Sequence, residues 1–400
     1  MYFTPQLRNC FHVMKFVLRG QVCFEKCTLQ RLSYTTRALG NHALKDDISA
    51  SEKEKENCFN ISGKFLLKSP YTPWSPEPAS HKSHSHQHEP GGGGQGWRLA
   101  SLLALSLIST KTEAEEAEKR ESELIIMIKR GILALKGGEL NKAEQLLHVA
   151  LKMAQETNNE QAVTYIFDLL ANLAYQREQY PKAQRLFKDV LQRLLSGGMA
   201  EDDNAVVEIS LKLASVYASE GDYEKAVQGF QFCIATQEEK ISKHGEANLD
   251  EDSLLLWAMS MDWYARFLLN LHKFELAKQH FLKAYEMSVR VSGPLHSQTA
   301  VLLNDIGSVC SLQKNYTEAV DYLEKAIAAA RESESPEIGS FYVNLGTVFL
   351  QQGLHGEAKR CCREGLALSK KLKNKDGAEE AEICLTEIEK VLKGEKSNEV

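Results

Sequence analysis

Polar side chains at helical spacing are the best candidates for binding chemistry in this sequence. Asp262 and Arg266 lie four residues apart, and so do Asn304 and Ser308, so each pair would stand about one turn apart on a helix. Amide and hydroxyl groups could hydrogen-bond an extended peptide, and a guanidinium could hold a carboxylate. An exposed Asp262–Arg266 pair that bonds only to itself would contribute little. The residues expected on this partner-binding face are Asp168, Asn172, Ser215, Asp262, Arg266, Asn304, Ser308 and Thr347.

No catalytic motif accompanies these residues. The glycine run at 91–94 precedes neither Lys-Ser/Thr nor a strand-to-helix switch, so it does not predict a phosphate loop. A Gly-x-Ser-x-Gly elbow and a His-Glu-x-x-His pair are both absent from the sequence. The sequence therefore predicts a protein that is not an enzyme, with no catalytic residue, no cofactor and no small-molecule substrate.

Two groups of residues could bind a metal by type alone. One is the tract of His81, His84, His86 and His88, which stands in a low-complexity stretch where nothing fixes ligand geometry. The other is the Cys23-x-x-x-Cys27 pair, which lacks a second pair of His or Cys ligands. We expect a solvated linker at the histidines and no metal site in the chain.

The nine cysteines show no disulfide framework. Five of them fall in helical stretches, mostly at apolar positions: Cys233, Cys310, Cys361, Cys362 and Cys384. This pattern favours reduced thiols packed as small hydrophobic groups, in a compartment without structural disulfides.

The elements that must position the polar residues are helical hairpins. In the stretch 221–230, a polar turn at Gly221 and Asp222 is followed by Tyr223, Ala226 and Phe230. A small residue at Ala226 lets two helices approach closely, and Phe230 fills the adjoining groove. We expect these three residues to be packing residues with no binding role of their own.

This pattern occurs six times in the chain. The small residue of the second helix stands at Ala143, Ala183, Ala226, Ala277, Ala319 and Ala358. Twelve residues earlier, a small residue of the first helix stands at Gly131, Ala171, Ala214, Ala265, Gly307 and Gly346. The pattern resembles the tetratricopeptide repeat, which implies an all-α, right-handed superhelical solenoid of about six hairpins with a C-terminal capping helix.

The repeats are longer than is usual for this family. The second-helix alanines are 40, 43, 51, 42 and 39 residues apart, against a usual period of about 34. The joint at 293–299 is similar to the one seen in kinesin light chains. The predicted repeats are 124–158, 164–197, 207–241, 258–292, 300–333 and 339–373, followed by a capping helix at 376–393 and a disordered tail at 394–400.

The residues before the repeats have a different composition. Residues 1–40 hold six basic residues against one acid, although the whole chain carries a net charge of −6; this is typical of a mitochondrial transit peptide. Residues 41–96 are rich in Pro, Gly and His and predict a disordered linker. The acidic remainder argues against general nucleic-acid binding.

An apolar segment at 97–110 precedes a charged lead-in helix at 111–123. Its uncharged run of ten residues, 99–108, is shorter than the roughly 20 residues that a spanning helix needs. Three interpretations stay open: a sorting signal, a short inner-membrane anchor, or an N-terminal capping helix.

Three stretches resemble one mitochondrial family of tetratricopeptide repeat proteins: 165–174, 194–199 and 203–217. The resemblance covers about residues 123–375. It implies a non-enzymatic role in assembly and maintenance of respiratory complex III at the inner mitochondrial membrane. It also implies partners among complex III subunits, including the Rieske iron–sulfur protein, whose fragments are turned over there. The alternative is a cytosolic kinesin light-chain-like or cytokinesis adaptor.

Overall fold

The structure, a computed structural model, describes residues 100–398. The transit-peptide-like segment, the linker with its four histidines and the first cysteines of the chain therefore lie outside the described residues. Within 100–398 the chain is helical throughout, with no strand. The chain divides into two compact units, with the division between Leu173 and Ala174.

The described part of the first unit begins with an unusually long helix. Helix α4 (Ala100–Lys136) has 37 residues and packs against α5 (Leu140–Glu156), which is followed by α6 (Glu160–Gln176). Gly131 marks the crossing of α4 and α5, because a Cβ there would lie 2.9 Å from Leu147 Cδ2. None of the described helices has the length and apolarity that crossing a membrane requires.

Helix α4 joins three segments that differ in composition. The apolar segment from residue 100 onward, the charged lead-in and the first helix of the first repeat form one continuous helix. Glu, Ala, Lys and Arg dominate the lead-in, and these residues favour helix. No proline or glycine interrupts the chain between 100 and 130, so nothing ends the helix there.

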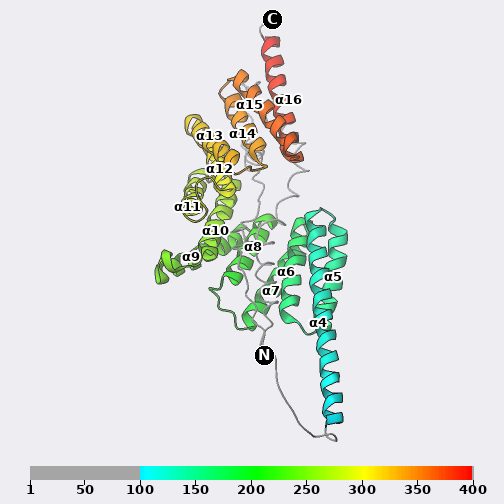
Figure 1. Ribbon diagram of the computed structural model, residues 1–400. Helices are drawn as coiled ribbons and strands as arrows, with labels where there is room; N and C mark the ends of the chain where they lie inside the picture. Colours follow the sequence, from blue (N-terminus) through cyan, green and yellow to red (C-terminus); the bar gives the residue numbers. More distant parts are fainter. Residues whose placement is uncertain (1–99, 399–400) are drawn as a thin grey trace, which may run out of the picture. The chain divides into compact units, whose positions relative to one another are not determined.

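The second unit contains the remaining helices, which pack as antiparallel neighbours. They are α7 (Tyr180–Ser196), α8 (Asn204–Glu220), α9 (Tyr223–His244), α10 (Glu251–Asn270), α11 (Phe274–Ser292), α12 (Ser297–Leu312), α13 (Tyr316–Glu332), α14 (Ile338–Gln351), α15 (His355–Lys371) and α16 (Lys375–Asn398). A short 3-10 turn, η2 (Glu246–Asn248), stands in the acidic insertion between α9 and α10. The pairs α8–α9, α10–α11, α12–α13 and α14–α15 are in direct contact (Figure 1).

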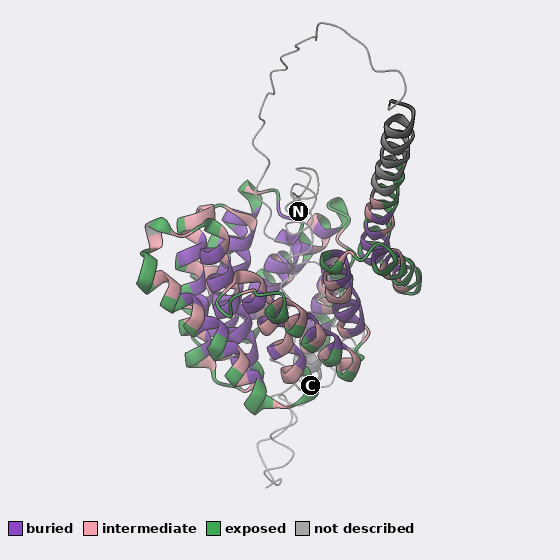
Figure 2. Ribbon diagram, turned by 90° about the horizontal axis from the view of Figure 1, so that it is seen from below, coloured by how far each residue is buried: buried purple, intermediate pink, exposed green. Residues whose placement is uncertain are grey.

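The expected small residues lie where the helices cross. Ala226, Ala277, Ala319 and Ala358 are completely buried, and a Cβ on Gly307 would lie 2.8 Å from Leu323 Cγ. Buried positions follow the inward sides of the helices (Figure 2). The tetratricopeptide-like helical packing is confirmed, while the right-handed superhelix, the count of six hairpins and the repeat boundaries stay predictions.

In the stretch 221–230, Ala226 and Phe230 are buried packing residues as expected, whereas Tyr223 is 52% exposed. Gly221 ends α8 in the left-handed region at φ 83°, and the Asp222 carboxylate accepts a hydrogen bond from the Lys225 backbone N–H at the start of α9. Phe230 is 1% exposed. Its ring centroid lies 5.6 Å from that of Tyr264 and 5.4 Å from that of Phe267, both on α10. Phe230 therefore joins one hairpin to the next.

Two predictions at the carboxyl end were wrong. Cys362 and Cys384 form a disulfide between α15 and α16, whereas reduced thiols were expected at both. The two cysteines come together because α15 and α16 pack side by side. The Cα atoms of Cys362 and Cys384 are 6.2 Å apart. Cys233, Cys310 and Cys361 are free and buried, as expected. Helix α16 also continues past Gly394 to Asn398, where a disordered tail was expected.

Candidate functional site

The most highly charged part of the interior lies between α10 and α12. Arg266 donates from Nε to Asp262 Oδ1 at 3.0 Å, one turn earlier on α10, and from its terminal nitrogen to Asp305 Oδ2 on α12. Asp262 is 2% exposed, Arg266 7% and Asp305 0%. The alternative of a self-bonding i,i+4 pair is thus half right: the pair exists, but it is buried and shared with a third charge.

Burial and the guanidinium act on the two carboxyl groups in opposite directions. Removal from water raises the pKa of Asp262 and of Asp305, because the charged form loses its hydration, while Arg266 lowers both. For Asp305 the balance is a pKa of about 7, with the neighbouring Asp262 charge adding to the rise. Two carboxylates and one guanidinium together form a charge cluster that links α10 to α12, the first helices of two successive hairpins.

A row of amides and hydroxyls continues from this cluster onto α14. Asn344 donates to Asn304 Oδ1 at 2.8 Å, and the Asn304 amide lies 3.4 Å from Asp305 Oδ1. Ser308 donates to the Asn304 carbonyl one turn earlier, at 2.9 Å. Asn304 and Ser308 are completely buried, so in this conformation their polar atoms serve the protein itself.

The other predicted residues are the buried Asn172 and the half-buried Asp168, Ser215 and Thr347. Asn172 donates to the backbone carbonyl of Asp168 at 2.7 Å and to its carboxylate at 3.0 Å, within α6 of the first unit. Ser215 and Thr347 are half-buried and donate to the carbonyls of Leu211 and Val343, four residues earlier. Their hydroxyls are engaged in their own helices but stand nearer the surface.

The structure therefore divides the predicted set. Asp262 and Arg266 come together with Asp305, and Asn304 adjoins that cluster, whereas the hydroxyls of Ser215 and Thr347 donate hydrogen bonds within their own helices. The expectation of side chains projecting into an open groove is wrong for the deeply buried members, which are Asn172, Asp262, Arg266, Asn304 and Ser308. Their part in partner binding stays a prediction.

Sequence reasoning missed Asp305 and Asn344. Both stand one residue after the register position that gave Asn304, and they are 39 residues apart, as are the small residues Gly307 and Gly346. Comparing this adjacent position between repeats could have found them. What it could not show is that Arg266, from the previous repeat, reaches across to Asp305.

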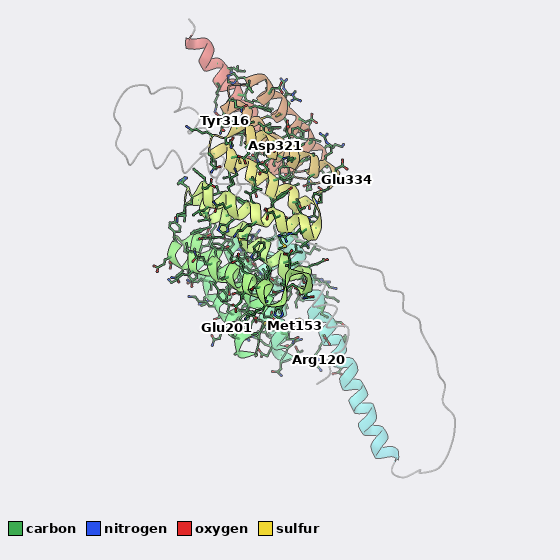
Figure 3. The ribbon with its side chains drawn as sticks, turned by 90° about the vertical axis from the view of Figure 1, so that its left-hand side faces the viewer. Arg120, Met153, Glu201, Tyr316, Asp321 and Glu334 are labelled. Atoms are coloured by element: carbon green, nitrogen blue, oxygen red, sulfur yellow. A yellow bond between two sulfur atoms is a disulfide. The ribbon has the colours of Figure 1, made fainter. Side chains whose placement is uncertain are left out.

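On α13, by contrast, a charged pair is exposed to solvent. Lys325 pairs with Asp321 on α13 at 2.6 Å, and both side chains are more than half exposed; Figure 3 labels Asp321 on this helix. Such exposed pairs contribute about 0–1 kcal/mol to the free energy of unfolding.

A pocket of about 340 Å³ beside α15 is lined by Gly356, Lys359, Arg360, Arg363 and Glu364, none of them a predicted site residue.

Metal ligands do not gather in the part of the chain that the structure describes. No group of three or more His, Cys, Asp or Glu side chains there has a geometry that could hold an ion. The histidine tract lies outside the described residues, so the expectation of no metal at that tract stays a prediction.

Comparison with known proteins gives the repeats a family. Models of the tetratricopeptide repeat match residues 255–332, and also 169–231 and 313–359. Among solved structures, the chain is similar to BtubC from P. vanneervenii, with a TM-score of 0.48 and 19% identity over 58% of this chain and 91% of that one.

Sequence relatives cover more of the chain. It is 36% identical over 280 residues to a Drosophila melanogaster protein named tetratricopeptide repeat protein 19 homolog, mitochondrial, covering 70% of this chain and 75% of the relative. It is 37% identical over 281 residues to the Homo sapiens protein named tetratricopeptide repeat protein 19, mitochondrial, covering 68% and 74%. The chain has buried alanines at its helix crossings, and the matches span about three quarters of the length of these relatives. It therefore belongs to the family of mitochondrial tetratricopeptide repeat protein 19.

Proposed function

We propose that this protein is a non-enzymatic interaction protein of mitochondria that supports the assembly and maintenance of respiratory complex III. The observation that carries the proposal is its membership of a mitochondrial tetratricopeptide repeat family over about 70% of the chain. Stacked helical hairpins present extended surfaces for protein partners, which suits a maintenance factor. The partners proposed are complex III subunits, including the Rieske protein and its fragments.

Association with the inner membrane is part of the same proposal. The basic segment at 1–40 would direct the chain to mitochondria, and the apolar stretch near residue 100 leads directly into the repeats through α4. A C-terminal fluorescent tag followed by cell fractionation tests the address. A purely cytosolic signal would favour the adaptor alternative, which also expects an uncleaved amino terminus in the native protein.

Contact with complex III is tested by co-purification and crosslink mapping. We expect complex III subunits to co-purify with the tagged chain, with crosslinks concentrated on the first helices of the hairpins. A chain that reaches mitochondria but yields no crosslink to any complex III subunit would contradict the proposed partners and leave the address intact.

The half-buried hydroxyl positions offer a sharper variant test. Ser215→Arg on α8 would place a long charged side chain at the predicted binding face, so we expect recovery of complex III subunits to fall at least about tenfold. Gln228→Arg on α9 is the matched control, because Gln228 is exposed and belongs to no predicted binding position. Equal recovery with both variants would place the interface elsewhere.

A further inference from the structure

Helix α16 occupies an apolar seat formed by α14 and α15. The cluster at its centre consists of Val343 on α14, Ala358 and Cys362 on α15, and Ala381, Cys384 and Ile388 on α16. Ala381 and Ile388 are completely buried. Phe349, Leu350, Leu366, Leu385 and Leu392 pack around this cluster. The seat therefore accepts the apolar face of an amphipathic helix, at present the chain's own.

Glycines allow the three helices to approach closely. A Cβ on Gly339 of α14 would lie 2.9 Å from the Gly365 carbonyl oxygen of α15. A Cβ on Gly377 of α16 would lie 2.7 Å from Ser369 Oγ. Ser369 is completely buried, and its hydroxyl has no hydrogen-bond partner among residues 100–398. This end of the seat is thus shaped for a helix that carries a very small residue.

Two lysines of α15 pair with acidic residues of α16 at the rim of the seat, while the buried Glu337 at the start of α14 lies near Glu380 and Asp376 of α16. Lys370 of α15 pairs with Glu382 of α16 at 3.0 Å, and Lys359 of α15 pairs with Glu389 at 4.0 Å. Both pairs are largely exposed, except for Lys359 at 32%, so they contribute little to the strength of docking. They do specify that the docked helix should carry acidic residues outside its apolar face.

A covalent bond crosses the middle of this contact. The disulfide joins Cys362 on α15 to Cys384 on α16, 22 residues apart, and both cysteines belong to the central cluster. Helix α16 is the last helix that the structure describes, and it packs mainly against α14 and α15. Without the disulfide, nothing covalent would hold it in its seat apart from the short turn that precedes it.

We propose that the seat on α14 and α15 is a docking site for an acidic amphipathic helix of a partner protein, and that the Cys362–Cys384 disulfide keeps the site closed by fixing α16 in it. Two molecules of a small thiol, or one protein dithiol, open the site: their two thiol groups become a disulfide, and the two electrons and two protons released convert Cys362–Cys384 into two thiols. The fitting partner helix has the spacing of Gly377, Ala381, Cys384 and Ile388, with small residues first and a large aliphatic residue last.

The first measurement is amide hydrogen exchange on the full wild-type chain, oxidised and reduced. Reduction should speed exchange of the α16 amides at least about tenfold, because the disulfide restrains local opening of this helix, and it should leave α12 unchanged. Unchanged α16 exchange would overturn the proposal, and so would equal acceleration in α12, which would indicate general loosening of the fold.

The second measurement traps a helix in the open seat. The probe is a synthetic peptide of residues 375–393 whose Cys384 is activated as a disulfide with thionitrobenzoate. In the full-length Cys384→Ser chain, the Cys362 thiol should attack the peptide sulfur. A new disulfide then forms, thionitrobenzoate leaves with the bonding electron pair, and the thiol proton passes to solvent. We expect an adduct at Cys362, located by peptide mapping.

Two controls make the trap decisive. The oxidised wild-type chain should give no adduct at Cys362, since this sulfur is held in the disulfide and the site is closed. A probe with Ile388→Asp should react at least about tenfold more slowly, because it cannot bury its apolar face. Reaction at Cys361 instead of Cys362, or equal rates with both probes, would overturn the docking site. If Cys384→Ser does not fold, Cys384→Ala replaces it, with the same outcomes.

Discussion

Arg266 shows how one side chain can change from a candidate ligand group into a structural one. It bonds two carboxylates on neighbouring helices, and none of the three side chains is accessible. Burying a guanidinium with two carboxylates is costly unless every charge is paired. The cluster is therefore better suited to fixing the register of α10 against α12 than to binding a partner.

Replacing Arg266 should be severely destabilising. Arg266→Leu would leave Asp262 and Asp305 buried near one another without a cation, so we expect a loss of roughly 3–5 kcal/mol in the free energy of unfolding. The control is Arg290→Leu, which removes an exposed pair with Glu246 and should cost about 1 kcal/mol or less. Urea unfolding of both variants measures the difference. Similar losses of stability in the two variants would show that burial adds nothing to the cost of removing Arg266.

Glu337, at the start of α14, should make stability depend on pH. Burial raises its pKa from 4.5 to about 8, and the nearby Glu380 and Asp376 charges add to the rise, while a hydrogen bond from Asn374 opposes it. The folded state thus holds a proton that the unfolded chain releases between pH 4.5 and 8. Stability should fall as pH rises through this window and level off above it.

Glu337→Gln should remove that dependence. The amide keeps the size of the side chain but cannot ionise, so we expect a gain of roughly 1–3 kcal/mol at pH 8 and little change at pH 5. Thermal unfolding across this range provides the measurement. Glu332→Gln, at the exposed last residue of α13, is the control and should leave the pH profile as it is. A parallel shift at all pH values would contradict the titration of Glu337.

At the scale of elements, hairpin packing depends on small residues at the crossings. A Cβ on Gly229 would lie 2.8 Å from Ala214 Cβ, which shows how closely α9 crosses α8. Ala226, one turn earlier on α9, is completely buried. The crossing has no room for a larger side chain without movement of a helix.

Ala226→Leu should overfill this crossing. We expect a loss of roughly 1–3 kcal/mol, because the added atoms force side chains or the backbone out of place. Gln228→Leu, two residues later on the exposed side of α9, adds a similar side chain without entering the crossing and should change stability by less than about 0.5 kcal/mol. Equal melting temperatures for the two variants would count against the repeat alignment.

The boundaries of helices were less predictable than their packing. The sequence divides 97–136 by composition, from apolar to charged to amphipathic, but backbone propensity favours helix through the charged part and α4 runs unbroken from Ala100 to Lys136. Composition indicates whether a segment is exposed to water or packed against apolar groups, but not where a helix begins or ends. The end of a helix requires a residue that stops it, such as proline or a capping group.

At the scale of the whole molecule, the disulfide bears on the compartment. Disulfides persist in oxidising environments and are rare where thiols are kept reduced. Within mitochondria, an intact Cys362–Cys384 bond favours the intermembrane space for the folded repeats over a reducing matrix.

Alkylation in intact mitochondria can check this expectation. Trapping free thiols and then comparing reduced with non-reduced samples by mass spectrometry should show Cys362 and Cys384 protected, with Cys310 alkylated once the protein is unfolded. Protease should reach the repeats after rupture of the outer membrane alone. Full alkylation of Cys362 under the same conditions would place the chain in a reducing compartment.

The sequence by itself determined the helical repeat. Small residues recur at Ala226 and its equivalents because two helices cannot cross closely with anything larger, and this demand repeats with each hairpin, so it can be read from spacing alone. The apolar face of α16 was equally predictable from the sequence, since Ala381, Cys384 and Ile388 follow helical periodicity. Local periodicity carries this information because each helix obeys it independently of its neighbours.

Only the tertiary structure decided which polar groups are accessible and which cysteines meet. Arg266 and Asp305 are 39 residues apart in sequence, and Cys362 and Cys384 are 22 apart. Each contact depends on how one helix is rotated and displaced against the next, which the spacing within either helix does not specify. An Asp or Arg at a groove position reads the same in sequence whether it faces solvent or a buried countercharge, because burial is a property of what packs over it.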